Sequence, residues 1–384
     1  MLSVISILGD VAMAAAGLGV LYMLTAIFAV RRFAAKPHVP ATSRPPVTLL
    51  KPVCGDDPGL YENLKSFCTQ DYGDVQVVIG AHRAADPAVP VVQKLIADLP
   101  DADITLVIDG QLAGSNFKVC NLANMMAAAR HDLLVLADSD MRVGPDYLAT
   151  IVAPLEDEAV GLVTCLYSGR PAGGLWSKLG CGFINYGFLP SVLVGLLIGA
   201  GDGCFGATIA LRRKTLERVG GFAALAHQLA DDYMLGSLVR SLGLKVVVSS
   251  YVVENQVLEP TLSALVAHEL RWNRTIRSIT PMGLAASMVT HPVALATLAL
   301  PLSEFNPIAG LIFALSLAGR MALVYTCDGV FGLTPLKARL VPIRDALSFG
   351  LLIASFCGQR IVWRDHRFQV NQGGELTFEG DPLA

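Results

Sequence analysis

A long uncharged segment stands near the start of the chain. The run Val11–Val30 carries no charged residue and, at about 1.5 Å of helical rise per residue, is long enough to cross the hydrocarbon core of a bilayer. Arg31, Arg32 and Lys36 follow it, and by the positive-inside rule they place its carboxyl end in the cytoplasm. A cleaved signal peptide has its positive charge before the apolar run, so the pattern predicts a transmembrane anchor over residues 1–36.

Uncharged runs return in the last third of the sequence. Ala285–Leu302 and Pro307–Tyr325 predict a transmembrane hairpin over residues 281–330. Arg320 lies inside the second run, near its cytoplasmic end, where a long basic side chain is expected to snorkel towards water. With the N-terminal anchor, the pattern predicts three spans.

Two other uncharged segments allow more than one structure. Ala346–Gly358 is shorter than a span and is flanked by arginines, which favours an interfacial or re-entrant helix in a basic cytoplasmic tail over residues 331–384; a fourth span is the alternative. Phe183–Ala200 is long enough to span, but crossing would put the acidic motifs before and after it on opposite sides of the membrane. It is expected to lie on the bilayer surface, to line an apolar acceptor cleft, or equally to be a buried core helix.

The middle of the chain, residues 45–280, has a different pattern of apolar and polar residues. Short apolar runs alternate with helical patterns, which predicts an α/β domain with a mostly parallel sheet covered on both faces. Ligands of such sheets bind at the carboxyl ends of the strands. The expected strands are 47–50, 75–79, 104–108, 133–137 and 161–165, and the expected helices are 60–69, 89–99, 116–129 and 147–155.

Composition narrows the class of protein. The 384 residues are 53% hydrophobic and 16% charged, which excludes a disordered chain. A formal net charge of -3 argues against a nucleic-acid partner, because phosphate binding needs a basic surface. The eight cysteines form no Cys-x-x-Cys pair and are expected to be buried thiols in a reducing compartment.

The most informative motif is Asp138-Ser139-Asp140, directly after the apolar run 133–137. A buried strand that ends in Asp-x-Asp puts two carboxylates on one face at the ligand-binding edge of the sheet. Such hard oxygen ligands suit Mg²⁺ or Mn²⁺ bound together with a substrate diphosphate. The position after a strand makes the motif more specific than the tripeptide alone.

A second acidic pair, Asp231-Asp232, precedes the predicted helix Tyr233–Ser241. An N-capping role at the start of this helix accounts well for one aspartate, but less well for two adjacent ones. The functional interpretation makes Asp232 a general base beside an acceptor hydroxyl.

The third motif is His268-Glu269-Leu270-Arg271-Trp272. A zinc protease would need histidine where Trp272 stands, so that class is excluded. On a helix, His268, Arg271 and Trp272 share one face, and a cation, an imidazole and an indole suit a diphosphate leaving group and a sugar or lipid surface. Arg274 and Arg277 are expected simply to flank the next span.

A glycine-rich motif, Gly201–Gly206, matches the spacing of a dinucleotide-binding loop. The next predicted helix, Lys214–Val219, begins too late for that role. The glycines, Gly203 among them, are instead expected to let the backbone approach a substrate closely.

Together these motifs resemble a known family. Their order, D, DxD, (E/D)D and (Q/R)xxRW, is similar to that of family 2-like glycosyltransferases with a GT-A fold, and more closely to the ceramide glucosyltransferase branch; His268 departs from the Q/R position. Within that branch, Gly169–Trp176 and His268–Trp272 most resemble bacterial hopanoid-biosynthesis glycosyltransferases. The resemblance covers about residues 45–375 and rests on Asp86, Asp138-Ser139-Asp140, Asp231-Asp232-Tyr233, His268-x-x-Arg271-Trp272, Leu50-Lys51-Pro52, Gln70-Asp71-Tyr72 and Gly114-x-Asn116-x-Lys118.

The resemblance implies a role for each matching position. Asp86 and Lys118 would bind the donor, a UDP-sugar, and Arg271 would stabilise the leaving diphosphate. Trp272, His268 and Gly203 would shape the acceptor or leaving-group site. Asp138 and Asp140 would hold the nucleotide and a divalent metal, and Asp232 would be the catalytic base of an inverting transfer.

In the hopanoid group, the implied reaction moves N-acetylglucosamine from UDP-GlcNAc to bacteriohopanetetrol. The branch relatives use UDP-glucose and ceramide. The expected location is the cytoplasmic (inner) membrane of a bacterium, with several spans and the catalytic domain in the cytoplasm. A processive polysaccharide synthase and a membrane sensor that binds nucleotide sugar without turnover are the rival hypotheses.

Overall fold

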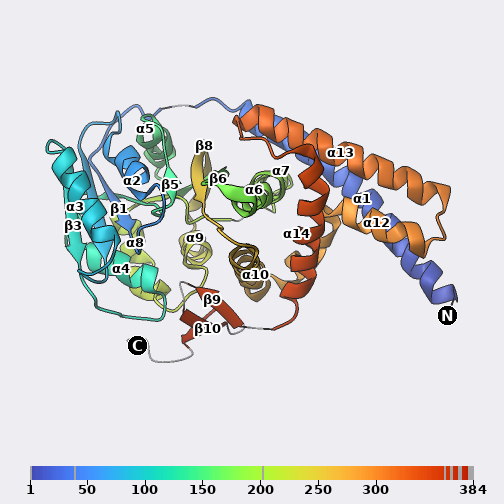
Figure 1. Ribbon diagram of the computed structural model, residues 1–384. Coiled ribbons are helices and arrows are strands. Elements are labelled where there is room, and N and C mark those ends of the chain that lie inside the picture. Colours follow the sequence, from blue (N-terminus) through green and yellow to red (C-terminus); the bar gives the residue numbers. More distant parts are fainter. Residues whose placement is uncertain are drawn as a thin grey trace. The chain divides into compact units, whose positions relative to one another are not determined.

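The computed structural model describes residues 2–38, 40–200, 203–358, 360–363, 366–370 and 374–378 (Figure 1). The chain forms two compact units, each assembled from separate stretches of sequence. The sheet unit comprises Pro37–Ala172, Asp202–Leu258 and Phe368–Ala384. The helical unit comprises Met1–Lys36, Gly173–Gly201 and Glu259–Arg367.

The sheet unit is built on an eight-stranded sheet with the order β3-β2-β1-β4-β7-β6-β8-β5. Strands β3, β2, β1 and β4 run parallel, β7 is antiparallel to both of its neighbours, and β6 and β8 are parallel. This confirms the predicted α/β fold with a mostly parallel sheet. The strands are β1 (Val47–Pro52), β2 (Val75–Ala81), β3 (Asp103–Ile108), β4 (Leu133–Leu136), β5 (Met141–Arg142), β6 (Val160–Pro171), β7 (Ile209–Arg212) and β8 (Lys245–Val257).

Both faces of the sheet are covered, because successive side chains of a buried strand point to opposite faces. On β1, Val47 and Leu49 enter one core, whereas Leu50 enters the other. Helices α2, α3 and α5 supply apolar side chains to the first core, and α4, α8 and α9 to the second. The helices of this unit are α2 (Leu60–Cys68), α3 (Ala88–Asp98), α4 (Phe117–Met125), α5 (Tyr147–Val152), η1 (Ala153–Glu156), α8 (Arg213–Arg218), η3 (Phe222–Leu225) and α9 (Asp231–Ser241).

The helical unit contains the apolar helices. Helix α1 packs along α12 and α13, and α10 packs against α14. The elements in this part of the chain are α1 (Leu2–Ala34), α6 (Gly174–Phe183), the π-helical turn η2 (Ile184–Phe188), α7 (Leu189–Leu197), α10 (Leu262–Ile279), α11 (Pro281–Ala286), η4 (Ser287–Thr290), α12 (Pro292–Leu302), α13 (Pro307–Phe331), η5 (Ala338–Leu340), α14 (Val341–Ser355) and β9 (Arg360–Trp363). Near the C-terminus, β10 (His366–Val370) pairs in antiparallel fashion with β11 (Leu376–Phe378).

The helices that are long and apolar enough to span a membrane differ partly from those expected. Among the described residues they are Val4–Ala34, Gly174–Leu197 and Pro307–Phe331. The expected span 285–302 is instead a pair, Pro281–Thr290 and Pro292–Leu302, bent by 72°. The bend falls where Pro292 follows His291, because the residue before a proline is disfavoured in the helical conformation.

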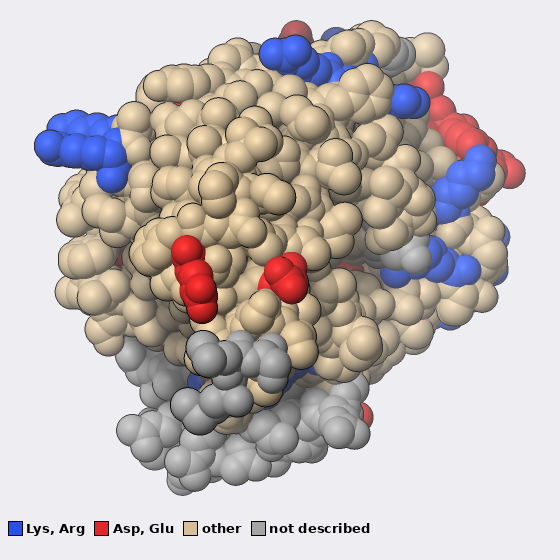
Figure 2. All heavy atoms as spheres, turned by 90° about the vertical axis from the view of Figure 1, so that its right-hand side faces the viewer, with Lys and Arg blue, Asp and Glu red and all other residues tan. Residues whose placement is uncertain are grey.

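Residues 183–197 of the uncharged segment belong to the continuous helix Gly174–Leu197, and 56% of the most apolar stretch of this helix is buried. The three interpretations of this segment, as an interfacial helix, as the lining of an acceptor cleft and as a core helix, stay predictions. Figure 2 shows a broad face of uncharged atoms broken by few charged side chains. Exposed Leu21, Leu24, Phe28, Leu311 and Leu315 of α1 and α13 are the kind of side chains that lipid would cover.

Arg320 does not snorkel. Its guanidinium is buried, donates to both carboxylate oxygens of Asp345 at 2.6–3.0 Å and reaches the carbonyl oxygen of Tyr186 at 2.5 Å. A buried charge needs a partner of opposite sign, and Asp345 of α14 supplies it.

Arg274 and Arg277 also have structural partners. Arg277 donates to the carbonyl oxygens of Ser355 and Gly358, and Arg274 to that of Cys357. These carbonyls end α14, where the last turn of a helix leaves acceptors unpaired and a cation is favourable. The two arginines therefore cap α14, beyond the flanking role that the sequence indicated.

Candidate active site

The Asp138-Ser139-Asp140 motif begins where β4 ends. The amide of Ala137 donates to the carbonyl of Leu50, which carries the pairing with β1 one residue beyond β4. The backbone oxygen of Asp138 then accepts a hydrogen bond from Lys51 Nζ at 2.6 Å. The motif thus lies at the carboxyl edge of the parallel strands, as the sequence predicted.

Lys51 is a site residue whose importance sequence reasoning missed. It is fully buried at the end of β1, with Nζ 3.5 Å from the centroid of the Phe67 ring. Burial lowers its pKa to about 7, although the charges of Asp138 and Asp140 act in the opposite direction. A lysine that ends an otherwise apolar strand was the available signal, because a buried ammonium needs partners.

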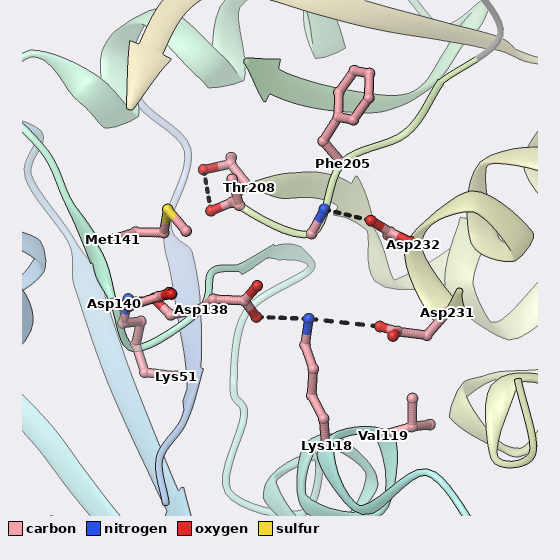
Figure 3. Close-up of polar contacts among 12 residues, drawn as sticks. Lys51, Lys118, Val119, Asp138, Asp140, Met141, Phe205, Thr208, Asp231 and Asp232 are labelled. Atoms are coloured by element: carbon pink, nitrogen blue, oxygen red, sulfur yellow. Dashed lines mark hydrogen bonds and ion pairs between the residues drawn. The ribbon is translucent and has the colours of Figure 1, made fainter. Parts of the chain in front are cut away.

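Lys118 links two acidic segments. Its Nζ lies 2.6 Å from Asp138 Oδ1 and 3.7 Å from Asp231 Oδ2 (Figure 3). Burial by itself lowers the pKa of Lys118, but the charges of Asp138 and Asp231 outweigh it and the pKa is raised. The side chain is therefore a fixed cation at neutral pH.

Asn116 holds the helix that carries Lys118. It is fully buried and caps α4, with its Oδ1 accepting from the amide of Val119 at 3.1 Å. Its Nδ2 donates to the Gln228 carbonyl at 2.7 Å and to Asp231 Oδ1 at 3.3 Å. One amide thus joins the start of α4 to the segment that opens α9.

Asp232 lies in the first turn of α9. Its Oδ1 accepts from the Tyr233 amide at 2.7 Å, and its Oδ2 accepts from the Gly206 amide at 2.8 Å, a bond drawn in Figure 3. Burial and the neighbouring charge of Asp231 raise the pKa of Asp232 to about 6. The N-cap position of α9 is Ala230, so the N-capping interpretation of the acidic pair is wrong. The raised pKa brings the Asp232 carboxyl closer to the range in which a general base works.

Asp140 has one engaged and one unpaired oxygen. Its Oδ2 accepts from Asn255 Nδ2 at 2.9 Å, whereas Oδ1 is buried and has no hydrogen-bond partner among the described residues. Burial, followed by the charge of Asp138, raises the pKa of Asp140 to about 6. A buried unpaired carboxylate oxygen is costly unless a cation binds it, so Asp140 fits a divalent metal.

The glycine nearest to the charged side chains is Gly206. A Cβ at this position would lie 3.2 Å from Lys118 Nζ, 3.3 Å from Asp138 Oδ2 and 3.4 Å from Asp232 Oδ2. A Cβ on Gly203 would instead meet the ring of Phe205 at 2.5 Å. Gly201 and Asp202 of the same motif lie outside the described residues.

We expect Gly206→Ala to lower kcat/KM about tenfold or more, because a methyl group there displaces charged side chains that must keep their geometry. Gly329→Ala is the matched control, since nothing lies within 4 Å of a Cβ at that position. Steady-state kinetics of both variants checks the prediction. Equal activities would show that Gly206 does not approach reacting groups.

Asp86 lies on the loop before α3 and is buried. Its Oδ1 accepts from the amides of Gly55 at 2.8 Å and Ala88 at 2.9 Å. These bonds join the loop after β1 to the start of α3, so the side chain has a structural role whatever it binds. Its predicted donor contact stays a prediction.

His268, Arg271 and Trp272 belong to α10 of the helical unit. The rings of His268 and Trp272 are 4.6 Å apart between centroids, which bears out their predicted shared face. His268 Nδ1 lies 2.5 Å from Glu259 Oε1, and Trp272 also packs against Phe183. Their roles in a reaction stay predictions.

The family to which the sequence belongs defines the class of protein, a glycosyltransferase, and its fold is like the GT-A type. The chain belongs to glycosyl transferase family 21, whose model matches residues 11–376. It is therefore a hexosyltransferase, and the family implies a nucleotide-sugar donor and a lipid acceptor.

The chain is similar to two ceramide glucosyltransferases of Caenorhabditis elegans. It is 24% identical to ceramide glucosyltransferase 1 over 350 residues, which cover 88% of this chain and 74% of the relative. It is also 24% identical to ceramide glucosyltransferase 3 over 374 residues, covering 87% and 75%.

Among solved structures, the chain resembles the mannosyltransferase PcManGT from Pyrobaculum calidifontis, in complex with GDP-Man and Mn²⁺. The TM-score is 0.54 at 20% identity, and the match covers 91% of this chain and 99% of that one. At this identity the similarity supports the shared fold.

Proposed function

We propose that this protein transfers one sugar from a UDP-sugar to a hydroxyl group of a membrane lipid, with inversion at the anomeric carbon. The observation that carries the proposal is the Asp138–Lys118–Asp231 chain of ion pairs beside Asp232, at the carboxyl edge of the sheet. Carboxylates and a fixed cation there suit a charged diphosphate donor and a hydroxyl that must lose a proton.

In this mechanism the acceptor oxygen attacks the anomeric carbon while Asp232 takes the hydroxyl proton. The bond between that carbon and the phosphate oxygen breaks, and UDP leaves with the electron pair. Asp232 suits the task because the Gly206 and Tyr233 amides fix both of its oxygens and its pKa is about 6. Lys118 places a permanent positive charge beside Asp138 and Asp231.

Asp138 and Asp140 would hold a divalent cation, Mg²⁺ or Mn²⁺. The unpaired Oδ1 of Asp140 fits a metal ligand. Mg²⁺ is usually bound by one or two carboxylates and completed by substrate phosphates, which suits a site with these two aspartates. When bound, the cation neutralises charge on the diphosphate.

Removing divalent metal with EDTA is expected to abolish transfer, and adding Mn²⁺ or Mg²⁺ to restore it. In Asp140→Asn the metal concentration for half-maximal activity should rise about tenfold or more, because a ligand charge is lost. Titration of activity against metal measures both effects. Full turnover in EDTA-treated protein would remove the metal from the proposal.

For the donor and acceptor we propose UDP-GlcNAc and bacteriohopanetetrol. The support is the resemblance of Gly169–Trp176 and His268–Trp272 to hopanoid-biosynthesis glycosyltransferases. Transfer of glucose from UDP-glucose to ceramide is the second candidate, favoured by the similarity to ceramide glucosyltransferases. Both reactions would take place at the cytoplasmic face of a bacterial inner membrane, where UDP-sugars are found.

One experiment separates these candidates. The full chain, purified in detergent, is incubated with Mn²⁺ and either UDP-sugar, with bacteriohopanetetrol or ceramide as acceptor, and the lipids are analysed by mass spectrometry. N-acetylglucosaminyl hopanoid would support the first candidate, and glucosylceramide the second. A polymer would favour a processive synthase, and intact UDP-sugar with every acceptor would overturn the proposed function.

A further inference from the structure

The segment Gly374–Leu376, near the C-terminus, lies against the loop that leads into α9. The carbonyl of Gly374 accepts from the Leu229 amide at 2.9 Å, and the Leu376 amide donates to the His227 carbonyl at 2.8 Å. Gln228 and Glu375 form an antiparallel bridge. Residues 374–376 thus form a strand-like pair with residues 227–229.

The same segment also reaches the start of α4. Ser115 Oγ donates to the Leu376 carbonyl at 2.9 Å and lies 3.2 Å from His227 Nδ1. Leu376 is 4% exposed. The C-terminal segment therefore touches both stretches of chain that lead into the candidate active site, one ending in Lys118 and the other in Asp231-Asp232.

Those two stretches are already closely packed on each other. The Asn116 amide donates to the Ala226 carbonyl at 2.8 Å, and a Cβ on Gly114 would lie 2.3 Å from the same oxygen. Asn116 also bonds to Gln228 and Asp231 through its side chain. A displacement of residues 226–229 is thereby passed to Asp231 through one buried amide.

We propose that Gly374–Leu376 is a positioning element that holds the 226–230 loop against α4 and so sets the geometry of Lys118, Asp231 and Asp232. Without it, the Leu229 amide and the His227 carbonyl lose their backbone partners. These two backbone groups would then have to form hydrogen bonds with water, or the loop would have to shift. A shift of the loop would move Asp231 and Asp232, which follow it. The inference rests on the proposed function, because it gives these residues a reacting geometry to keep.

The test compares two truncations of the full chain. Ending the chain after Gly373 removes the segment, whereas ending it after Phe378 keeps it and serves as the matched control. We expect the shorter chain to lose about tenfold or more in kcat, with a smaller change in the KM for the lipid and a thermal midpoint close to that of the control. A peptide of residues 371–384, added in trans, should restore part of the lost turnover.

Ser115→Ala provides a variant of full length. It removes the hydroxyl that donates to Leu376, and we expect a fall in kcat of a few-fold in a folded protein. Hydrogen exchange adds a readout that needs no substrate: the Leu229 amide should lose protection in the shorter chain.

The outcomes separate the two proposals. A full-length protein that transfers no sugar overturns the proposed function. In that case, hydrogen exchange at the Leu229 amide alone tests whether Gly374–Leu376 holds the loop. Active full-length protein with equal kcat in both truncations overturns this inference alone. If the shorter chain fails to fold, unchanged kcat in Ser115→Ala overturns it, and reduced kcat supports it.

Discussion

Asp232→Asn should lower kcat by about 10²-fold or more, with little change in the KM for the UDP-sugar. An amide keeps the shape of the carboxylate but cannot take the proton of the attacking hydroxyl. Its oxygen can still accept one of the two bonds from the Gly206 and Tyr233 amides, so the fold around the start of α9 should persist. Steady-state kinetics with the identified acceptor measures the effect.

The control for this variant is Asp157→Asn. Asp157 also belongs to the sheet unit, but its side chain is 56% exposed and pairs only with the surface residue Lys245 among the ion pairs of the described residues. Its replacement should leave turnover unchanged. Near-normal turnover in Asp232→Asn would remove the assignment of the general base.

The pH dependence of the wild type follows from the same group. A general base works as a carboxylate, and burial, with the nearby charge of Asp231, raises the pKa of Asp232 to about 6. Activity at saturating metal should therefore fall as the pH drops through about 6, whereas an unperturbed aspartate would keep it down to about 4. The measurement is a profile of kcat/KM between pH 4.5 and 8. If the profile stays flat down to pH 4.5, it contradicts the raised pKa of Asp232.

Arg344→Met should destabilise the protein by about 3–5 kcal/mol, the cost of leaving one partner of a buried ion pair alone. Arg344 of α14 is 1% exposed and makes a bidentate pair with Glu269 of α10, with both N–O distances 2.6 Å. It also donates to Ser348 and to the Leu179 carbonyl, so it joins α10, α14 and α6. Without it, the Glu269 carboxylate stays buried and loses its partner.

Unfolding of the purified protein in detergent, followed by heat or denaturant, checks this expectation. The double variant Glu269→Leu/Arg344→Met should recover most of the loss, because it removes both charges together. Arg170→Met breaks the exposed pair with Glu254 and should cost about 1 kcal/mol or less. A similar small cost for Arg344→Met would show that the pair is not a principal tie between these helices.

Local pattern was enough to predict most of the sheet unit. Strands β1, β2 and β4 stand within a few residues of the expected ranges, because a buried parallel strand must be apolar on both faces wherever it occurs. Asp138 was found for a related reason: a charged residue directly after such a strand lies at the ligand-binding edge. Family membership followed from spaced motifs that no single element contains.

Other features depended on contacts between distant parts of the chain. The residues around Arg320 in the sequence do not reveal that its partner is Asp345, and those around Arg344 do not reveal Glu269. A snorkelling side chain was therefore the expectation for Arg320. Gly203 and Gly206 belong to one glycine-rich motif, and the sequence does not tell which of them lies closest to the charged side chains. Only the packing places Gly206 beside Lys118 and Gly203 against an aromatic ring.

By itself, the sequence determined the class of the protein: an α/β enzyme with long apolar segments near its N-terminus and in its last third, and with carboxylates at the edge of its sheet. The periodicity of apolar residues and the spacing of motifs are local properties of the sequence, so they can be read without knowing which residues are in contact in the fold. The tertiary structure alone decided which charges meet: Lys51 beneath Asp138, Lys118 between Asp138 and Asp231, and the C-terminal segment against the 226–230 loop. A buried charge is stable only next to its partner, and that partner is supplied by the fold from anywhere in the chain.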